Sequence, residues 1–119
     1  MTQAALVILY VDSPSRSARF YEALLGCRPI EESPTFAMLP LREGVALGLW
    51  SRHTVEPGAE AAGGGGEIAF VTDDVDGTHA DWAARGLAIL QPPTDLDFGR
   101  TFVAQDPDGH RLRVFRPVP

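Results

Sequence analysis

Residues 107–115 read PDGHRLRVF, and residues 42–50, REGVALGLW, repeat their pattern 65 positions earlier. In both stretches a glycine turn leads into an alternation of residue types, with Gly44 matching Gly109 and Trp50 matching Phe115. Alternation with a period of two predicts a strand that presents its side chains in turn to opposite faces of a sheet. The two stretches therefore form the ends of two copies of one structural unit.

The start of the unit is repeated as well. Residues 5–11, ALVILYV, form an apolar run that predicts a strand, and residues 15–26, SRSARFYEALLG, have helical spacing with a glycine stop. Either Ser13 or Ser15 is suited to cap this helix. Residues 67–90, EIAFVTDDVDGTHADWAARGLAIL, repeat the order of strand, capping loop, helix and glycine stop. The chain thus contains a duplicated unit that begins with a strand and a helix.

Further strands follow each helix, and a glycine-rich segment joins the two copies. The stretches that predict these strands are FAMLPL (36–41), VALGLW (45–50), TFVAQ (101–105) and RLRVF (111–115). Residues 51–66, SRHTVEPGAEAAGGGG, lack an apolar period and end in four glycines, which is typical of a linker. The sequence predicts one α+β domain over 1–119 with two tandem βαβββ modules: module 1 (4–50), a glycine-rich linker (51–66) and module 2 (67–117).

Composition excludes several classes of function. The chain has 119 residues, a net charge of -6 and dispersed basic residues, so we expect no nucleic-acid partner. A single cysteine, Cys27, excludes an intrachain disulfide and a multi-cysteine zinc site, and we expect it to be a small buried residue. The first apolar run has no basic flank and is too short to span a bilayer. We therefore expect a soluble, cytoplasmic protein without a membrane partner.

Three motifs in order carry a resemblance to a known superfamily. The predicted first helix ends FYEALLG (20–26), the middle of the chain reads IAFVTDDVD (68–76), and the chain closes with DPDGHRLRV (106–114). This combination resembles the vicinal oxygen chelate superfamily, which includes glyoxalases, extradiol dioxygenases, fosfomycin-modifying enzymes and bleomycin-binding proteins. The resemblance implies a curved mixed sheet with a concave cleft, completed in a homodimer with swapped or unswapped halves.

Within that superfamily the chain looks most like the phenazine-antibiotic-resistance proteins. The stretches that carry this likeness are LGLWS (47–51), DFGRTF (97–102) and DPDGHRLRV (106–114). Such proteins bind a planar drug without a metal. The resemblance therefore implies a protein that sequesters a hydrophobic planar antibiotic by binding and not by catalysis.

The positions that hold a divalent metal in the superfamily's enzymes can be compared residue by residue. They correspond to Leu6 on the first strand, Glu67 at the start of the second copy, Arg113 on the final strand and a fourth position at Gly48. Of these four residues, only Glu67 has a side chain of a type that binds metals, and an arginine repels the cation that a carboxylate would bind. We therefore predict no metal and no cofactor.

Other residues do not replace that site. The three histidines, His53, His79 and His110, fall on none of the matching positions, and we expect each to be a surface or half-buried side chain. The DPDG stretch resembles the start of a calcium loop, but its twelfth position is Pro117 and not the required glutamate. It favours a turn in which Asp106 and Asp108 bond local backbone and Gly109 takes a positive φ.

Strand alternation separates a cleft face from a core face. The predicted cleft face consists of Leu6, Ile8, Tyr10, Ala46, Gly48, Trp50, Glu67, Ala69, Val71, Arg111, Arg113 and Phe115. The predicted core face consists of Val7, Leu9, Leu47, Leu49, Ile68, Phe70, Leu112 and Val114. The arginines of the last strand therefore face a cleft while its leucine and valine face the core.

The cleft face suits a flat aromatic ligand. Trp50 is expected to stack on it, the role its counterpart has in the phenazine-resistance proteins, while Gly48 leaves room and Arg113 meets a carboxylate or phenolate on its edge. Phe98 is placed to reach over the ligand from the same or the partner subunit. The full set of predicted ligand-binding residues is Trp50, Phe98, Arg113, Glu67, Gly48, Tyr10, Met38 and Phe36.

The sequence leaves several alternatives open. Trp50 can be a core residue, and Glu67 and Arg113 can form a structural ion pair instead of contacting a ligand. A second function class is an enzyme of the superfamily, with a metal bound by an unusual ligand set around Glu67 or with Glu67 as a metal-free general base. A third is a scaffold whose cleft serves only as a dimer interface.

Overall fold

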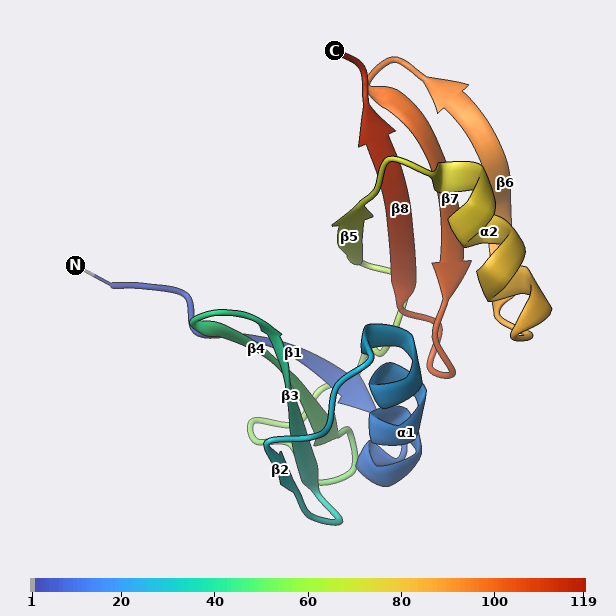
Figure 1. The fold of residues 1–119 in the computed structure, drawn as a ribbon. Helices are drawn as coiled ribbons and strands as arrows, with labels where there is room; N and C mark the ends of the chain where they lie inside the picture. Colours follow the sequence, from blue (N-terminus) through green and yellow to red (C-terminus); the bar gives the residue numbers. More distant parts are fainter. Residues whose placement is uncertain (1) are drawn as a thin grey trace. The chain divides into compact units, whose positions relative to one another are not determined.

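The computed structural model describes residues 2–119, which fold as two compact units, the first ending at Gly63 and the second spanning Gly64–Pro119. Its helices and strands, in chain order, are β1 (Leu6–Val11), α1 (Pro14–Leu25), β2 (Glu31–Glu32), β3 (Phe36–Arg42), β4 (Val45–Ser51), β5 (Glu67–Val71), α2 (Val75–Ala84), β6 (Ala88–Leu96), β7 (Gly99–Gln105) and β8 (Arg111–Pro117). Each unit runs strand, helix and three strands (Figure 1). The predicted α+β class with tandem βαβββ modules is confirmed.

The two units have the same sheet topology. The strand order is β1-β4-β3-β2 in unit 1 and β5-β8-β7-β6 in unit 2, so the strands form two four-stranded sheets, one in each unit. In each sheet the first strand pairs in parallel with the last and the other pairs are antiparallel. Leu6 lies opposite Ala46 just as Glu67 lies opposite Arg111. The internal repeat predicted from the sequence is therefore a repeat of register as well as of elements.

Each helix covers one face of the sheet in its own unit. In unit 1, Ala18 and Tyr21 of α1 are fully buried, together with Val11, Leu47 and Leu49 on the strands. In unit 2, Trp82 of α2 packs edge-on against Phe70 and Phe102, with ring centroids 6.0 and 5.3 Å away. Trp82 therefore has the packing role that its helical position predicted.

Side-chain caps fix where the helices begin. Ser13 is the N-cap of α1, and its hydroxyl accepts from the Arg16 N–H at 3.2 Å, which decides between the two serines. Asp74 caps α2 and accepts from the Gly77 N–H at 2.9 Å. Gly26 ends α1 with φ 69°, a left-handed conformation that glycine adopts without strain. Neither helix described within residues 2–119 has the length and apolar character needed to cross a membrane.

The turn before β8 forms, with Asp106 and Gly109 in their predicted roles. Asp106 Oδ1 accepts from the N–H groups of Asp108 and His110 at 2.9 and 2.8 Å, and Gly109 has φ 85°. This carboxylate closes a turn by bonding backbone amides.

Strands β2 and β6 were not among the predicted strands. β6 is the edge strand of its sheet, and its register against β7 shifts between Gln91 and Thr94, where Pro92 and Pro93 interrupt the pairing. Proline is tolerated in a sheet at edges and bulges because it has no N–H to donate. Because of these two prolines, the sequence did not predict this strand.

The segment predicted as a linker begins inside unit 1. Ser51 is the last residue of β4, and Val55 is buried with 6% exposure. The Arg52 N–H donates to the Val11 carbonyl at 2.8 Å. The first residues of this segment are therefore part of the fold of unit 1.

Candidate functional site

Each sheet has one face against its helix and one open face. The residues of the open face of unit 1 are Leu6, Ile8, Tyr10, Phe36, Met38, Ala46, Gly48 and Trp50, which lie side by side in register across β1, β4 and β3. The residues of the open face of unit 2 are Glu67, Ala69, Val71, Thr101, Val103, Gln105, Arg111, Arg113 and Phe115, in register across β5, β8 and β7. Leu47, Leu49, Leu112 and Val114 point the other way and are buried.

Val7 departs from the predicted core face. It is 43% exposed although its alternation places it with the buried set. The reason is that α1 packs mainly against β3 and β4, while β1 is the edge strand of the sheet. The start of β1 therefore lies beyond the cover of the helix, and Leu6 and Ile8 on its other face are exposed as well.

The open face of unit 1 is apolar and aromatic. Trp50 lies between Tyr10 on β1 and Phe36 on β3, and its ring meets the Phe36 ring edge-on with centroids 6.1 Å apart. Trp50, Phe36 and Met38 are half-buried, so this tryptophan belongs to a surface and not to the core. Of the predicted ligand residues, five come together here: Tyr10, Phe36, Met38, Gly48 and Trp50.

Gly48 does not leave open space, contrary to the expectation from the sequence. A Cβ at this position would lie 3.0 Å from Phe36 Cζ and 3.2 Å from Ile8 Cγ1. These two side chains already occupy the space over the glycine. Gly48 therefore lets Phe36 and Ile8 approach the sheet closely, and the exposed surface here is formed by their outer sides and by Trp50.

The open face of unit 2 holds a charged pair. Arg113 donates to both oxygens of Glu67, from Nε to Oε1 at 2.8 Å and from Nη2 to Oε2 at 3.0 Å. Its Nη1 donates to Thr101 Oγ1 at 3.1 Å, and the fully buried Thr101 hydroxyl donates to the Val114 carbonyl at 2.9 Å. The hydrogen bonds from Arg113 lower the pKa of Glu67 below its usual range. The ion pair weighed in the sequence is therefore present and has bidentate geometry.

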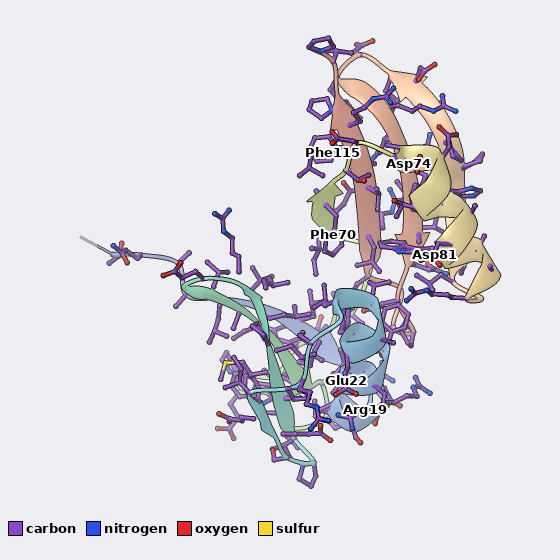
Figure 2. All side chains as sticks on the ribbon, viewed as in Figure 1. Arg19, Glu22, Phe70, Asp74, Asp81 and Phe115 are labelled. Atoms are coloured by element: carbon purple, nitrogen blue, oxygen red, sulfur yellow. The ribbon has the colours of Figure 1, made fainter. Side chains whose placement is uncertain are left out.

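Phe98 covers this pair from the turn between β6 and β7. The Arg113 Cζ atom lies 5.8 Å from the centroid of the Phe98 ring, a cation–π distance, and the Phe115 ring lies 6.1 Å away. Figure 2 marks Phe115 on β8. Phe98 is still 44% exposed. It therefore reaches over the open face of its own unit, where it meets Arg113 and Phe115.

Thr101 was not among the predicted site residues. The signal for it was a single hydroxyl in the apolar run TFVA of residues 101–104. Alternation within the sequence did not indicate that this hydroxyl is buried and bound to Arg113. The face on which Thr101 lies follows from the pairing of β7 with β8, which the sequence does not give.

The residues at the superfamily's metal positions do not fit a divalent cation. Leu6 and Gly48 offer no ligand atom, and both Glu67 oxygens accept from Arg113, whose charge opposes a cation. Among residues 2–119, no three His, Cys, Asp or Glu side chains are grouped so that they could hold a metal ion. The lowered pKa also makes Glu67 a weak general base at neutral pH.

The remaining candidates lie elsewhere. His53 Nε2 is 2.7 Å from Asp12 Oδ1 at the surface, and His79 meets the Phe102 ring edge-on at 5.3 Å. His110 is buried in the turn before β8, with 8% exposure, where a surface or half-buried side chain was expected. Cys27 is half-buried, and burial raises the pKa of its thiol, as suits an unreactive cysteine.

A family sequence model and curated relatives match most of the chain. The model described as Glyoxalase/Bleomycin resistance protein/Dioxygenase superfamily matches residues 3–114. The phenazine antibiotic resistance protein EhpR of Enterobacter agglomerans is 33% identical over 116 residues, which cover 92% of this chain and 88% of that protein. The putative glyoxylase CFP32 of Mycobacterium tuberculosis is 28% identical, and the match covers 93% of this chain but only 42% of that protein.

Solved structures agree with the fold. The solution structure of protein ATC0852 from Agrobacterium tumefaciens is 54% identical, covers 100% of both chains and superposes with a TM-score of 0.90. A glyoxalase-related enzyme from Fulvimarina pelagi superposes with a TM-score of 0.83 at 22% identity, covering 98% of this chain and 88% of that one. At that identity the second likeness shows a shared fold only.

Proposed function

The chain belongs to the glyoxalase/bleomycin resistance protein/dioxygenase superfamily, and on that basis we propose that it binds and sequesters a hydrophobic planar small molecule, such as a phenazine antibiotic, without a metal. The relative named as a phenazine antibiotic resistance protein supports this class of ligand. In this proposal the protein protects the cell by binding the drug in a fixed ratio, and it catalyses no reaction.

The observation that carries the proposal is the apolar, aromatic open face of unit 1. Trp50, Phe36 and Tyr10 lie in one row across three strands, half-buried and without a charged neighbour in that row. Such a surface is suited to stacking on a flat ring system. The predicted role of Trp50 as the stacking residue is part of the proposal.

The open face of unit 1 alone supplies a limited binding free energy. Burying about 200 Å² of a planar ring system contributes roughly 5 kcal/mol before the entropy cost of association. Micromolar binding needs about 8 kcal/mol. A tight sequestering protein therefore needs further contacts beyond one aromatic wall.

The second function class, an enzyme with a divergent site around Glu67, has less support. A metal-free general base needs a carboxylate whose pKa lies near the working pH, and Arg113 holds the pKa of Glu67 low. A metal would have to displace Arg113 from both oxygens of that carboxylate. We therefore propose a binding protein, acting in the cytoplasm.

We also propose that the protein is a homodimer. The edge strands β1 and β5 leave backbone groups unpaired on one side of each sheet. Exposed apolar side chains accompany them: Leu6, Val7 and Ile8 on β1, and Val71 on β5 with 70% exposure. Sedimentation equilibrium tests the dimer directly, and a monomer at all concentrations up to the millimolar range would contradict it.

Isothermal titration calorimetry tests the proposed function. The protein is treated with EDTA, dialysed, and titrated with phenazine and with a saturated, non-planar compound of similar size. We expect saturable binding of phenazine only, with the same affinity after Zn²⁺ or Mn²⁺ is added. Binding that appears only after a metal is restored would contradict the proposal and favour the metalloenzyme.

A further inference from the structure

The open face of unit 1 continues onto the edge strand β2 and ends there in a charged residue. Glu31 lies opposite Met38 on β3, and Met38 lies opposite Gly48 on β4. Residues directly opposite each other in an antiparallel pair point to the same face of the sheet, so Glu31 is on the face of Trp50. Among the described residues that the register places on this face, Glu31 is the only charged one.

The next glutamate along β2 faces the other way. Glu32 lies opposite Ala37, which is fully buried on the helix side of the sheet. The Glu32 carboxylate accepts from Arg19 of α1, which Figure 2 labels. Arg19 Nε also lies 3.5 Å from Glu22 Oε1 on the same helix. The charge of Glu32 is thus compensated on the helix side, while Glu31 is on the open face.

The charge of Glu31 is not compensated within the protein. With the residues from 2 to 119, its exposed carboxylate makes no hydrogen bond and no ion pair. Arg19 and Arg28 line a hollow at the outer edge of β2 together with it, but Arg19 is bound to Glu32, and neither arginine is ion-paired with Glu31. The chain has a net charge of -6, which attracts cations and repels anions. A cation is therefore the matching partner for this carboxylate.

Backbone bonds hold Glu31 beside the aromatic side chains of this face. On either side of it, the Ile30 N–H donates to the Met38 carbonyl at 2.6 Å and the Ser33 N–H donates to the Phe36 carbonyl at 2.8 Å. Phe36 is two residues from Met38, and such diagonal neighbours of a residue on the paired strand lie roughly 7–8 Å from it. The Glu31 side chain is long enough to reach the edge of a ring system that lies on these aromatic side chains.

We propose that Glu31 binds a protonated amine of the planar aromatic ligand that stacks on Trp50. The inference rests on the proposed function and names its ligand class: planar aromatic rings with an ammonium group on a side arm, in preference to neutral or anionic rings. The ammonium N–H groups donate to the Glu31 carboxylate while the rings cover Trp50 and Phe36. All three residues belong to one face of one sheet.

The test compares two probes of similar size that differ in charge. Dissociation constants for 2-(aminomethyl)phenazine, which is an ammonium ion at pH 7, and for neutral 2-(hydroxymethyl)phenazine are measured by calorimetry with the wild type, Glu31→Gln and Glu43→Gln. Glu43 is the matched control: it is exposed and lies in the turn between β3 and β4, at the far end of these strands from Phe36 and Trp50. Both substitutions remove one negative charge, so the net charge of the protein changes equally.

A charged hydrogen bond at an exposed site changes affinity by roughly 3- to 10-fold. We expect the wild type and Glu43→Gln to bind the ammonium probe at least ~3-fold tighter than the neutral probe, and Glu31→Gln to bind the two probes within a factor of ~1.5. Glu31→Asp, which keeps the charge on a shorter side chain, should retain part of the preference. Circular dichroism confirms that each variant is folded.

The neutral probe separates a failure of this inference from a failure of the proposed function. If the wild type binds both probes equally, or if Glu31→Gln and Glu43→Gln have the same preference, Glu31 is not the anchor, although binding of the neutral probe still supports the proposed function. If neither probe binds to the wild type, the proposed function and the inference fail together.

Discussion

Gly48 illustrates how much a single residue determines at a binding surface. The absence of a side chain lets Phe36 and Ile8 close over the strand, so the aromatic wall has its shape because position 48 is empty. A methyl group there would lie 3.0 Å from Phe36 Cζ. One residue thus connects the backbone of β4 to the exposed surface proposed to bind a planar ring.

Gly48→Ala is predicted to lower the free energy of unfolding by about 1–3 kcal/mol, because overpacking pushes Phe36 and Ile8 outward. The same shift should weaken phenazine binding. Urea denaturation measures the first effect. Gly58→Ala is the control, since a methyl group at Gly58 meets nothing within 4 Å. If both variants unfold at the same urea concentration, the close contact over Gly48 is unimportant.

The Glu67 and Arg113 pair predicts a specific dependence on pH. Because the folded-state pKa of Glu67 is lowered, its contribution to stability is present above the usual glutamate pKa of about 4.3 and is lost as the pH falls through the lowered value. Wild type should exceed Glu67→Gln by up to ~1 kcal/mol at pH 7, since the pair is partly solvent-exposed. The difference should shrink as the pH falls below the usual glutamate pKa. Urea unfolding over a series of pH values measures it, and a difference that is independent of pH would contradict this assignment.

At the scale of the element, the turn between β6 and β7 depends on Gly99. This residue has φ 146°, and a Cβ on it would lie 2.1 Å from the Arg116 carbonyl oxygen. The glycine lets β7 approach β8 while the turn presents Phe98 over Arg113. The exposed aromatic side chain therefore depends on a backbone conformation and a close approach that only glycine allows.

Gly99→Ala is predicted to cost at least ~1–3 kcal/mol of stability, because a methyl group there meets the Arg116 carbonyl oxygen and the backbone conformation is strained for alanine. Thermal unfolding measures this loss. Gly86→Ala is the comparison: Gly86 also has a positive φ, 88°, but a methyl group there has open space. The account fails if Gly86→Ala destabilises the protein as much as Gly99→Ala does.

The cap of α1 gives an element-scale prediction with a close control. Ser13→Ala should destabilise the protein by about 1 kcal/mol, because the Arg16 N–H loses its acceptor. Ser15→Ala, an exposed residue inside the helix, should change stability by less than ~0.5 kcal/mol. Chemical denaturation of both variants tests this, and equal effects would argue against Ser13 as the cap.

Elements with strong local signals could be predicted from the sequence, and those without them could not. The helices were identified by their spacing, by the serine and aspartate caps and by the glycine stops at Gly26 and Gly86. β6 was missed because Pro92 and Pro93 mark a turn locally, whereas the pairing with β7 that makes the segment a strand is a tertiary interaction. β2 was missed because two consecutive glutamates carry no alternation.

At the scale of the whole molecule, the internal repeat made the residues on the open face of each sheet predictable. It placed Trp50 and Phe115 at equivalent positions and put Glu67 and Arg113 on one face. It could not show which groups saturate each other, because side-chain pairing depends on distances that alternation does not contain. The occupied space over Gly48, the bound state of Arg113 and the position of Phe98 therefore required the structure.

The central claim is that a planar aromatic ligand binds on Trp50 without a metal, and the two tryptophans of the chain allow a direct measurement. In Trp82→Phe, Trp50 is the sole tryptophan and lies on the open face of unit 1. In Trp50→Phe, the sole tryptophan is Trp82, which has 8% exposure in the core of unit 2. Both proteins are treated with EDTA and titrated with phenazine while tryptophan fluorescence is recorded.

We predict strong, saturable quenching in Trp82→Phe and, in Trp50→Phe, loss of the saturable signal together with loss of calorimetric binding. Circular dichroism shows whether each variant keeps the wild-type fold. Quenching of equal amplitude and midpoint in both variants would place the ligand elsewhere. Quenching that requires added Zn²⁺ or Mn²⁺ would contradict the metal-free account.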